Sequence, residues 1–77
     1  MRYRVDGGGC REIGEWPNPH AAAMAFGVKL VGDGLAHSPV QVFVWCYVAN
    51  TTWTYMVRVK PRTGFDVSAE LADHQVE

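Results

Sequence analysis

The sequence lacks any strong imbalance of charge. Its 77 residues carry 7 Lys and Arg against 8 Asp and Glu, which gives a formal net charge of −1. A dedicated DNA-binding domain is usually clearly basic, so this near-neutral balance argues against strong binding to nucleic acid. The same balance argues against an acidic mimic of nucleic acid.

Cysteine is also scarce, with only Cys10 and Cys46 in the chain. Two cysteines are too few for a disulfide-stabilised scaffold, so we expect free thiols and a cytoplasmic protein. The opening stretch, MRYRVDGGGC, has no apolar signal-peptide core, and the longest apolar helical run, AAAMAFGV, is far too short to cross a bilayer. We therefore expect no membrane association.

Recognisable catalytic and metal-binding motifs are missing. Cys10 with His20 or His37 would make a nucleophile and base, but no family signature surrounds the cysteine. The three His and two Cys residues fit no zinc-site spacing. Glu12 and Glu15 lack an apolar pocket that would raise the pKa of a carboxyl group. The sequence therefore predicts a protein that is not an enzyme and that uses no metal or cofactor.

What the sequence does have is enough apolar residues for one compact domain. The apolar fraction is 48% and the charged fraction 19%, a composition typical of globular rather than disordered chains. The chain shows no repeat and no linker, so residues 1–77 are expected to form a single domain.

The N-terminal half predicts a hairpin followed by a helix. RYRVD alternates as a strand does, GGG turns the chain, and CREIGEW is a candidate strand pairing back on the first. Asn18 suits a helix N-cap and Pro19 the first helical position. The helix is expected over 19–31, ended by GDG. Apolar residues on two of its sides indicate burial on more than one side.

The stretch VQVFVWCYVANTTWTYMVRVK predicts a second hairpin. A strand over 40–49 is followed by Asn50, which can take the positive φ of a tight turn, and by a second strand. With residues 49 and 52 opposite each other, Val44 lies across from Val57.

A third strand is predicted where FDVSAEL alternates, with Phe65 opposite Val59. A C-terminal helix beginning at Asp66 or Ser68 is the alternative for this part of the chain, and ADHQVE is expected to be a frayed tail. The predicted class is therefore α+β. One main helix packs on an antiparallel sheet, which is built from a three-stranded C-terminal meander and an N-terminal strand or hairpin.

Both faces of this meander are apolar, and the helix is expected to cover the face that carries the valines. The opposite face carries a row of aromatic residues. The residues that we expect to bind a partner there are Phe43, Trp45, Tyr47, Met56, Arg58 and Lys60. Such residue types are enriched at protein interfaces, and exposed apolar patches mark interaction sites. We predict a protein-binding module, of an inhibitor or assembly type, that occupies the surface of another protein or of a second copy.

Two alternatives compete for the same face. The N-terminal segment, with Tyr3, Val5, Ile13 and Trp16, would make it a second core layer if it folded across it. Alternatively, the aromatic residues would stack the bases of single-stranded nucleic acid, with Arg58, Lys60 and Arg62 binding phosphates. Against that alternative, the consensus of RNA-binding sheets is missing, and Asp66 and Glu70 would repel phosphate.

In length, single-domain compactness and lack of catalytic motifs, the chain resembles the small α+β proteins of bacteriophages and mobile elements. That group includes anti-CRISPR and other host-inhibiting proteins. The resemblance implies an inhibitory role and is carried by no residue motif.

Overall fold

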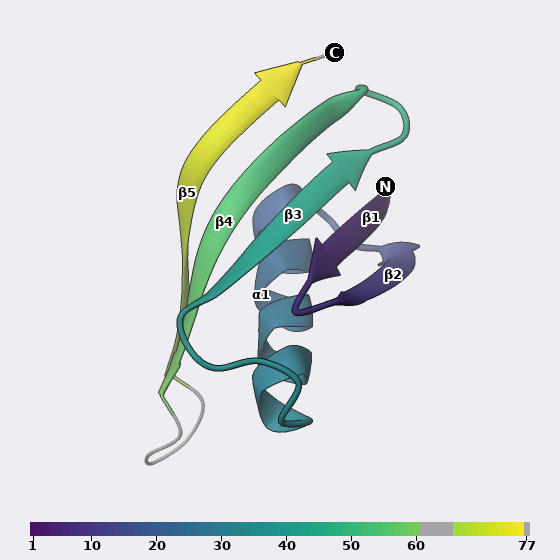
Figure 1. Cartoon of the computed structure of the whole chain (residues 1–77). Helices are drawn as coiled ribbons and strands as arrows, with labels where there is room; N and C mark the ends of the chain where they lie inside the picture. The colour runs from purple at the N-terminus through teal and green to yellow at the C-terminus, as the bar shows by residue number, and fades with distance from the viewer. Residues whose placement is uncertain (61–65, 77) are drawn as a thin grey trace.

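The computed structural model describes residues 1–60 and 66–76, apart from the side chains of Lys60 and Asp66, and places one helix against one face of an antiparallel sheet (Figure 1). The elements are, in chain order, β1 (Arg2–Gly7), β2 (Cys10–Glu15), α1 (Pro19–Gly32), β3 (Val40–Cys46), β4 (Thr51–Lys60) and β5 (Asp66–Val76). The five strands lie in the order β2-β1-β3-β4-β5. The predicted α+β class is confirmed: the N-terminal hairpin and the C-terminal meander form one sheet, joined where β1 pairs with β3.

The N-terminal hairpin forms as its sequence predicts. Gly8 and Gly9 have φ values of +54° and +78°, which glycine adopts at little cost in a two-residue hairpin turn. Tyr3 and Val5 then point to the helix side and are buried. On the same side of β2, Glu12 accepts a hydrogen bond from the Lys29 ammonium group of α1 at 2.9 Å.

Helix α1 begins and ends at the predicted signals. The Asn18 side-chain oxygen accepts a hydrogen bond from the Ala21 N–H at 2.7 Å, and Pro19 occupies the first turn. Beyond the helix, Gly34 takes a φ of +72°, the conformation that commonly follows a helix C-terminus. The residues that α1 buries are Ala22, Ala23, Phe26, Gly27 and Leu30.

Gly27 allows α1 to approach the sheet closely. A Cβ atom added at Gly27 would lie 2.5 Å from Cγ1 and 2.8 Å from Cβ of Val57, in the middle of β4. Val57 is fully buried, so its side chain has no room to move aside for a methyl group at position 27. The glycine that weakens the helical pattern in the sequence is therefore required by the packing of helix on sheet.

The hairpin of β3 and β4 has a different register from the predicted one. The strand expected over 40–49 ends at Cys46, because a turn follows in which the Asn50 N–H donates to the Cys46 carbonyl oxygen at 3.0 Å. Asn50 has the expected positive φ, +50°. Val44 consequently pairs with Trp53 rather than with Val57. The shift is an even number of residues, so each side chain that remains within β3 or β4 stays on its predicted face. Val48, which the predicted strand would place on the helix side, lies in the turn and is exposed.

Strand β5 continues to Val76, so the helical alternative and the frayed tail are both wrong. Val67 pairs with Val59, the position expected for Phe65. Phe65 itself and Arg62 lie outside the described residues.

A bulge near the middle of β5 keeps its two faces consistent. Tyr55 pairs with Leu71 and Thr54 pairs with Asp73, which leaves Ala72 as an extra residue on β5. Without this extra residue, Asp73 would point to the helix side. The bulge instead places its carboxylate on the opposite face and extends the strand by several residues.

An extra methyl group in a packed core usually costs about 1–3 kcal/mol, and the 2.5 Å approach to Val57 places Gly27→Ala in the upper part of that range. The better helix propensity of alanine offsets about 1 kcal/mol of that cost. We therefore expect Gly27→Ala to lower the free energy of unfolding by a net amount of about 1–2 kcal/mol. Gly32→Ala is the matched control, because beyond its chain neighbours and the backbone of its own helix no described atom lies within 4 Å of its added Cβ. Urea unfolding should show destabilisation by the first substitution only. Equal effects of the two would contradict the close approach.

Stability should fall at high pH because burial raises the pKa of Tyr3 and of Tyr55 above the usual 10.0. The unfolded chain ionises these hydroxyls at lower pH than the folded chain does. The stabilisation is thus complete below pH 10.0 and is lost as the pH rises through the raised pKa values. Urea midpoints measured across this range should show the fall, and Tyr3→Phe should reduce it. An unchanged fall in the variant would argue against burial of Tyr3.

Candidate protein-binding face

The sheet face opposite α1 is left uncovered by all residues that the structure describes. β1 lies beside β3 within the sheet, and β2 extends the sheet by one more strand. Tyr3 and Val5 are part of the helix-side core, and Trp16 packs against that core. Ile13 lies on the uncovered face and is 55% exposed. The alternative in which this segment forms a second core layer is therefore wrong.

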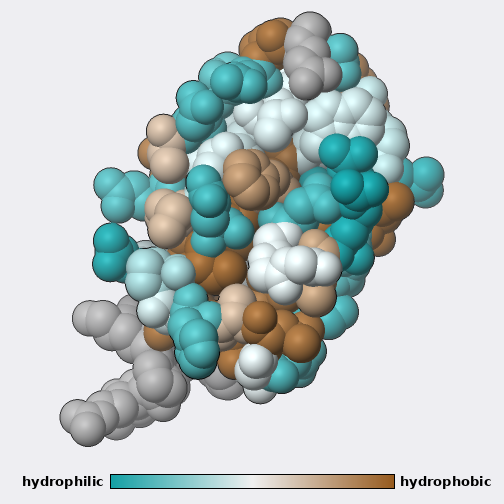
Figure 2. Space-filling view, in the orientation of Figure 1, coloured by the Kyte–Doolittle hydropathy of each residue, from teal (hydrophilic) through white to brown (hydrophobic). Residues whose placement is uncertain are grey.

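We call this surface the open face. In Figure 2, which views it directly, pale and brown surface over β3 and β4 lies between hydrophilic side chains at either side. Its central apolar residues are Phe43, Trp45, Tyr47 and Met56. Phe43 and Tyr47 are each 41% exposed, and the other two are half-buried. An antiparallel sheet with one wet face usually carries polar residues at such positions.

Trp45 is held by two contacts. The Arg4 guanidinium carbon lies 5.1 Å from the centre of a Trp45 ring, within range of a cation–π interaction. In addition, the rings of Trp45 and Tyr47 meet edge to face, with centroids 4.4 Å apart and planes at 67°. These contacts restrict the indole before any partner arrives, which lowers the entropy lost on binding.

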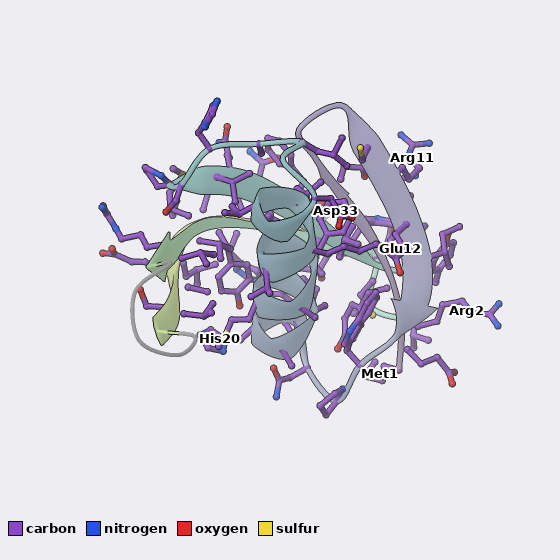
Figure 3. The ribbon with its side chains drawn as sticks, turned by 90° about the horizontal axis from the view of Figure 1, so that it is seen from below. Met1, Arg2, Arg11, Glu12, His20 and Asp33 are labelled. Carbon is purple, nitrogen blue, oxygen red and sulfur yellow. The ribbon has the colours of Figure 1, made fainter. Side chains whose placement is uncertain are left out.

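The arginines beside the aromatic residues are held by one carboxylate. Asp6 accepts from Arg4 Nε at 3.2 Å and from Arg11 Nε at 2.6 Å. The hydrogen bond to Asp6, and then its charge, raise the pKa of Arg11. Figure 3 shows Arg11 and Arg2 pointing away from α1, while Glu12 lies beside the helix. Such ion pairs near the surface add little stability. Here they hold the Arg4 and Arg11 side chains beside the aromatic residues.

The structure brings four of the predicted binding residues together and separates a fifth. The four are Phe43, Trp45, Tyr47 and Met56. Met56 pairs with Gln41, not with Trp45 as the predicted register implies. Arg58 is exposed on the same face but pairs with Ser68 of β5, toward the opposite end of the strand from Trp45. The side chains of Lys60 and Arg62 lie outside the described part of the chain.

Sequence reasoning missed the contribution of the first hairpin to this face. Arg4, Arg11 and Ile13 flank the aromatic residues because β1 pairs with β3. The alternation in RYRVD does put Arg4 on the side opposite Tyr3. It gives no indication of which strand lies next to β1, and so no indication that Arg4 would meet Trp45.

The residues considered for thiol chemistry are only partly brought together. Cys10 and His37 both line a wide depression of about 770 Å³ beside the glycine turn. His20 lies near the other end of α1, where its Nε2 is 3.2 Å from the Ala69 carbonyl oxygen. Within residues 1–60 and 66–76, no three His, Cys, Asp or Glu side chains gather closely enough to hold a metal ion. Nor does any helix in those ranges have the length and apolar character needed to span a membrane.

The chain matches no protein-family model, no curated protein and no solved structure. Its function is therefore inferred from the open face.

Neighbouring substitutions on β3 should report which face is inside. Val44 is fully buried, so Val44→Ala should lower the free energy of unfolding by about 2–3 kcal/mol through lost burial and a cavity. Phe43→Ala removes more carbon atoms, but from a half-exposed position. We therefore expect it to lower the free energy of unfolding by about 1 kcal/mol or less. Urea unfolding at low protein concentration measures both. A larger loss for Phe43→Ala would mean that the open face is covered in solution.

Proposed function

We propose that this protein is a non-enzymatic binding module that acts by occupying the surface of a partner protein with its open face. The observation that carries the proposal is an uncovered aromatic row, with Phe43 and Trp45 on the sheet face and Tyr47 in the turn that follows β3. Contiguous exposed apolar surface of this kind is costly in water and marks interaction sites in soluble proteins.

Binding would rest on a few anchors. Large aromatic side chains surrounded by a polar rim dominate the binding energy of many interfaces. Here Trp45 is the strongest candidate anchor, since Arg4 and Tyr47 already restrict its ring. The charged side chains on β1, β2 and β5 form the rim, where they would select partners and speed association more than they add affinity.

The proposal includes an inhibitory or assembly role in the cytoplasm. A small domain that covers part of a larger protein blocks whatever else binds there, which is the mode expected of the phage-type host inhibitors that the chain resembles. The two free thiols, Cys10 and Cys46, support a reducing compartment.

Binding of single-stranded nucleic acid is a weaker alternative. It would use the same rings for base stacking. However, the positive charge of Arg4 and Arg11 is partly neutralised by Asp6, and Glu70 and Asp73 lie on the same face and would repel phosphates.

Replacing Trp45 tests the proposal. Trp45→Ala should weaken capture of partner proteins by more than about tenfold, the loss expected for an anchor worth about 2 kcal/mol. Its far-ultraviolet circular dichroism should stay native. Leu71→Ala is the matched control, because Leu71 is 51% exposed but lies on the helix side of the sheet. Quantitative affinity capture compares the three chains.

Three outcomes would contradict this proposal. If Trp45→Ala and Leu71→Ala weaken partner capture equally, the open face is not the binding site. Unfolding of Trp45→Ala would place Trp45 in the core. Salt-sensitive binding of short oligonucleotides, lost in the same variant, would favour the nucleic-acid alternative.

A further inference from the structure

One row of side chains across the open face has a cation at one end and a carboxylate at the other. Cross-strand pairing defines the row as Arg11, Asp6, Phe43, Thr54 and Asp73. Arg11 belongs to the edge strand β2, Phe43 to the central strand β3 and Asp73 to the edge strand β5. The face is therefore electrostatically asymmetric about its own aromatic centre.

We propose that the partner of the open face is a second copy of this chain, related to the first by a two-fold axis that runs along β3. The inference rests on the proposed binding role of this face and names its partner. The axis reverses the strand order, so that β5 of one copy covers β2 of the other. Phe43 and Trp45 then meet their own counterparts, while Arg11 meets Asp73 of the partner subunit, and the reverse contact forms by symmetry.

Charge favours this axis over a perpendicular two-fold axis through the same row. A perpendicular axis through that row would lay each strand over its own counterpart, so that Arg11 would oppose the partner's Arg11 and Asp73 the partner's Asp73. Like charges opposed across an interface are unfavourable. With the axis along β3, the next row of described side chains is also free of such conflict, since Arg4 faces Thr52 of the partner subunit.

The open face offers enough area for a modest dimer. Strands spaced about 4.8 Å apart and residues rising about 3.3 Å each make the face roughly 24 Å by 23 Å over the five strands and the seven residues of β3. Two such faces would bury on the order of 1,100 Å² in total, near the lower end of specific interfaces. Two twisted sheets pack face to face with their strands within about 30° of each other. We therefore expect a dimer that dissociates on dilution.

A charge exchange between the two contact residues tests the proposal. Sedimentation equilibrium of the purified chain should show a concentration-dependent dimer. Arg11→Glu and Asp73→Lys should each weaken it by more than about tenfold, because each variant opposes like charges twice. An equimolar mixture of the two variants should recover the dimer, since one contact keeps its original pair and the other has its charges exchanged.

A matched control uses the neighbouring acidic residue. Glu70→Lys makes the same change of charge on the same face of β5, but Glu70 belongs to the row of Gln41 and Met56. In the dimer it would lie over the glycine turn of the partner's first hairpin, where there is no charge to meet. We expect Glu70→Lys to change the dimer dissociation constant by less than about threefold. Circular dichroism checks folding, and Arg11→Gln with Asp73→Asn replace any variant that unfolds.

The outcomes separate this inference from the proposed function. If the chain is a monomer at every concentration, the proposed dimer is wrong. Binding to a different protein would then still be tested by Trp45→Ala. The axis along β3 is overturned if the Arg11 and Asp73 variants dimerise as tightly as the original chain. It is also overturned if each variant dimerises weakly and their equimolar mixture does not recover the dimer. A dimer that survives Trp45→Ala unchanged uses another surface and overturns the use of the open face in self-association.

Discussion

A sheet has two faces, and the described part of the chain has one helix to cover them. α1 has 14 residues, a length of about 21 Å, and it covers only one face. The contact of Gly27 with Val57 brings helix and sheet together closely enough to exclude water from the valines. Within residues 1–60 and 66–76 nothing covers the other face, and the proposed binding role depends on the character of that face. Because that face is aromatic at its centre and charged at its sides, it is suited to contact another macromolecule.

The elements of the fold could be predicted because their signals are local. Asn18 caps the helix through its own side chain, and the glycines turn the first hairpin through their own φ values. Register could not be predicted, because it depends on the length of a turn. The hydrogen bond from the Asn50 N–H to the Cys46 carbonyl oxygen closes a turn between β3 and β4 that is longer than the tight turn expected from the sequence. The end of β5 was missed since the bulge at Ala72 breaks the alternation that marks a strand.

The candidate site was predictable to the extent that it lies on one hairpin. The aromatic residues of β3 are close in sequence, and alternation alone puts them on one face. Arg4 and Ile13 come from a hairpin some thirty to forty residues earlier, and only the pairing of β1 with β3 brings this hairpin beside Trp45. For Arg58, the sequence predicts the face of the sheet but not the distance from the aromatic residues. Its face follows from alternation, but its distance from Trp45 depends on the register.

The ion pair between Glu12 and Lys29 has a consequence for how copies of this chain can assemble. Glu12 sits on the helix side of β2, an edge strand, so a further strand added there would have to pack against a charged pair. Inward-pointing charges of this kind protect sheet edges from open-ended growth. At the opposite edge, the Asp73 carboxylate accepts the His74 N–H at 2.8 Å, and His20 contacts the Ala69 carbonyl oxygen. These edge contacts oppose association at the edges, where it would continue into fibres, and they are compatible with the proposed face-to-face dimer, in which association ends at two chains.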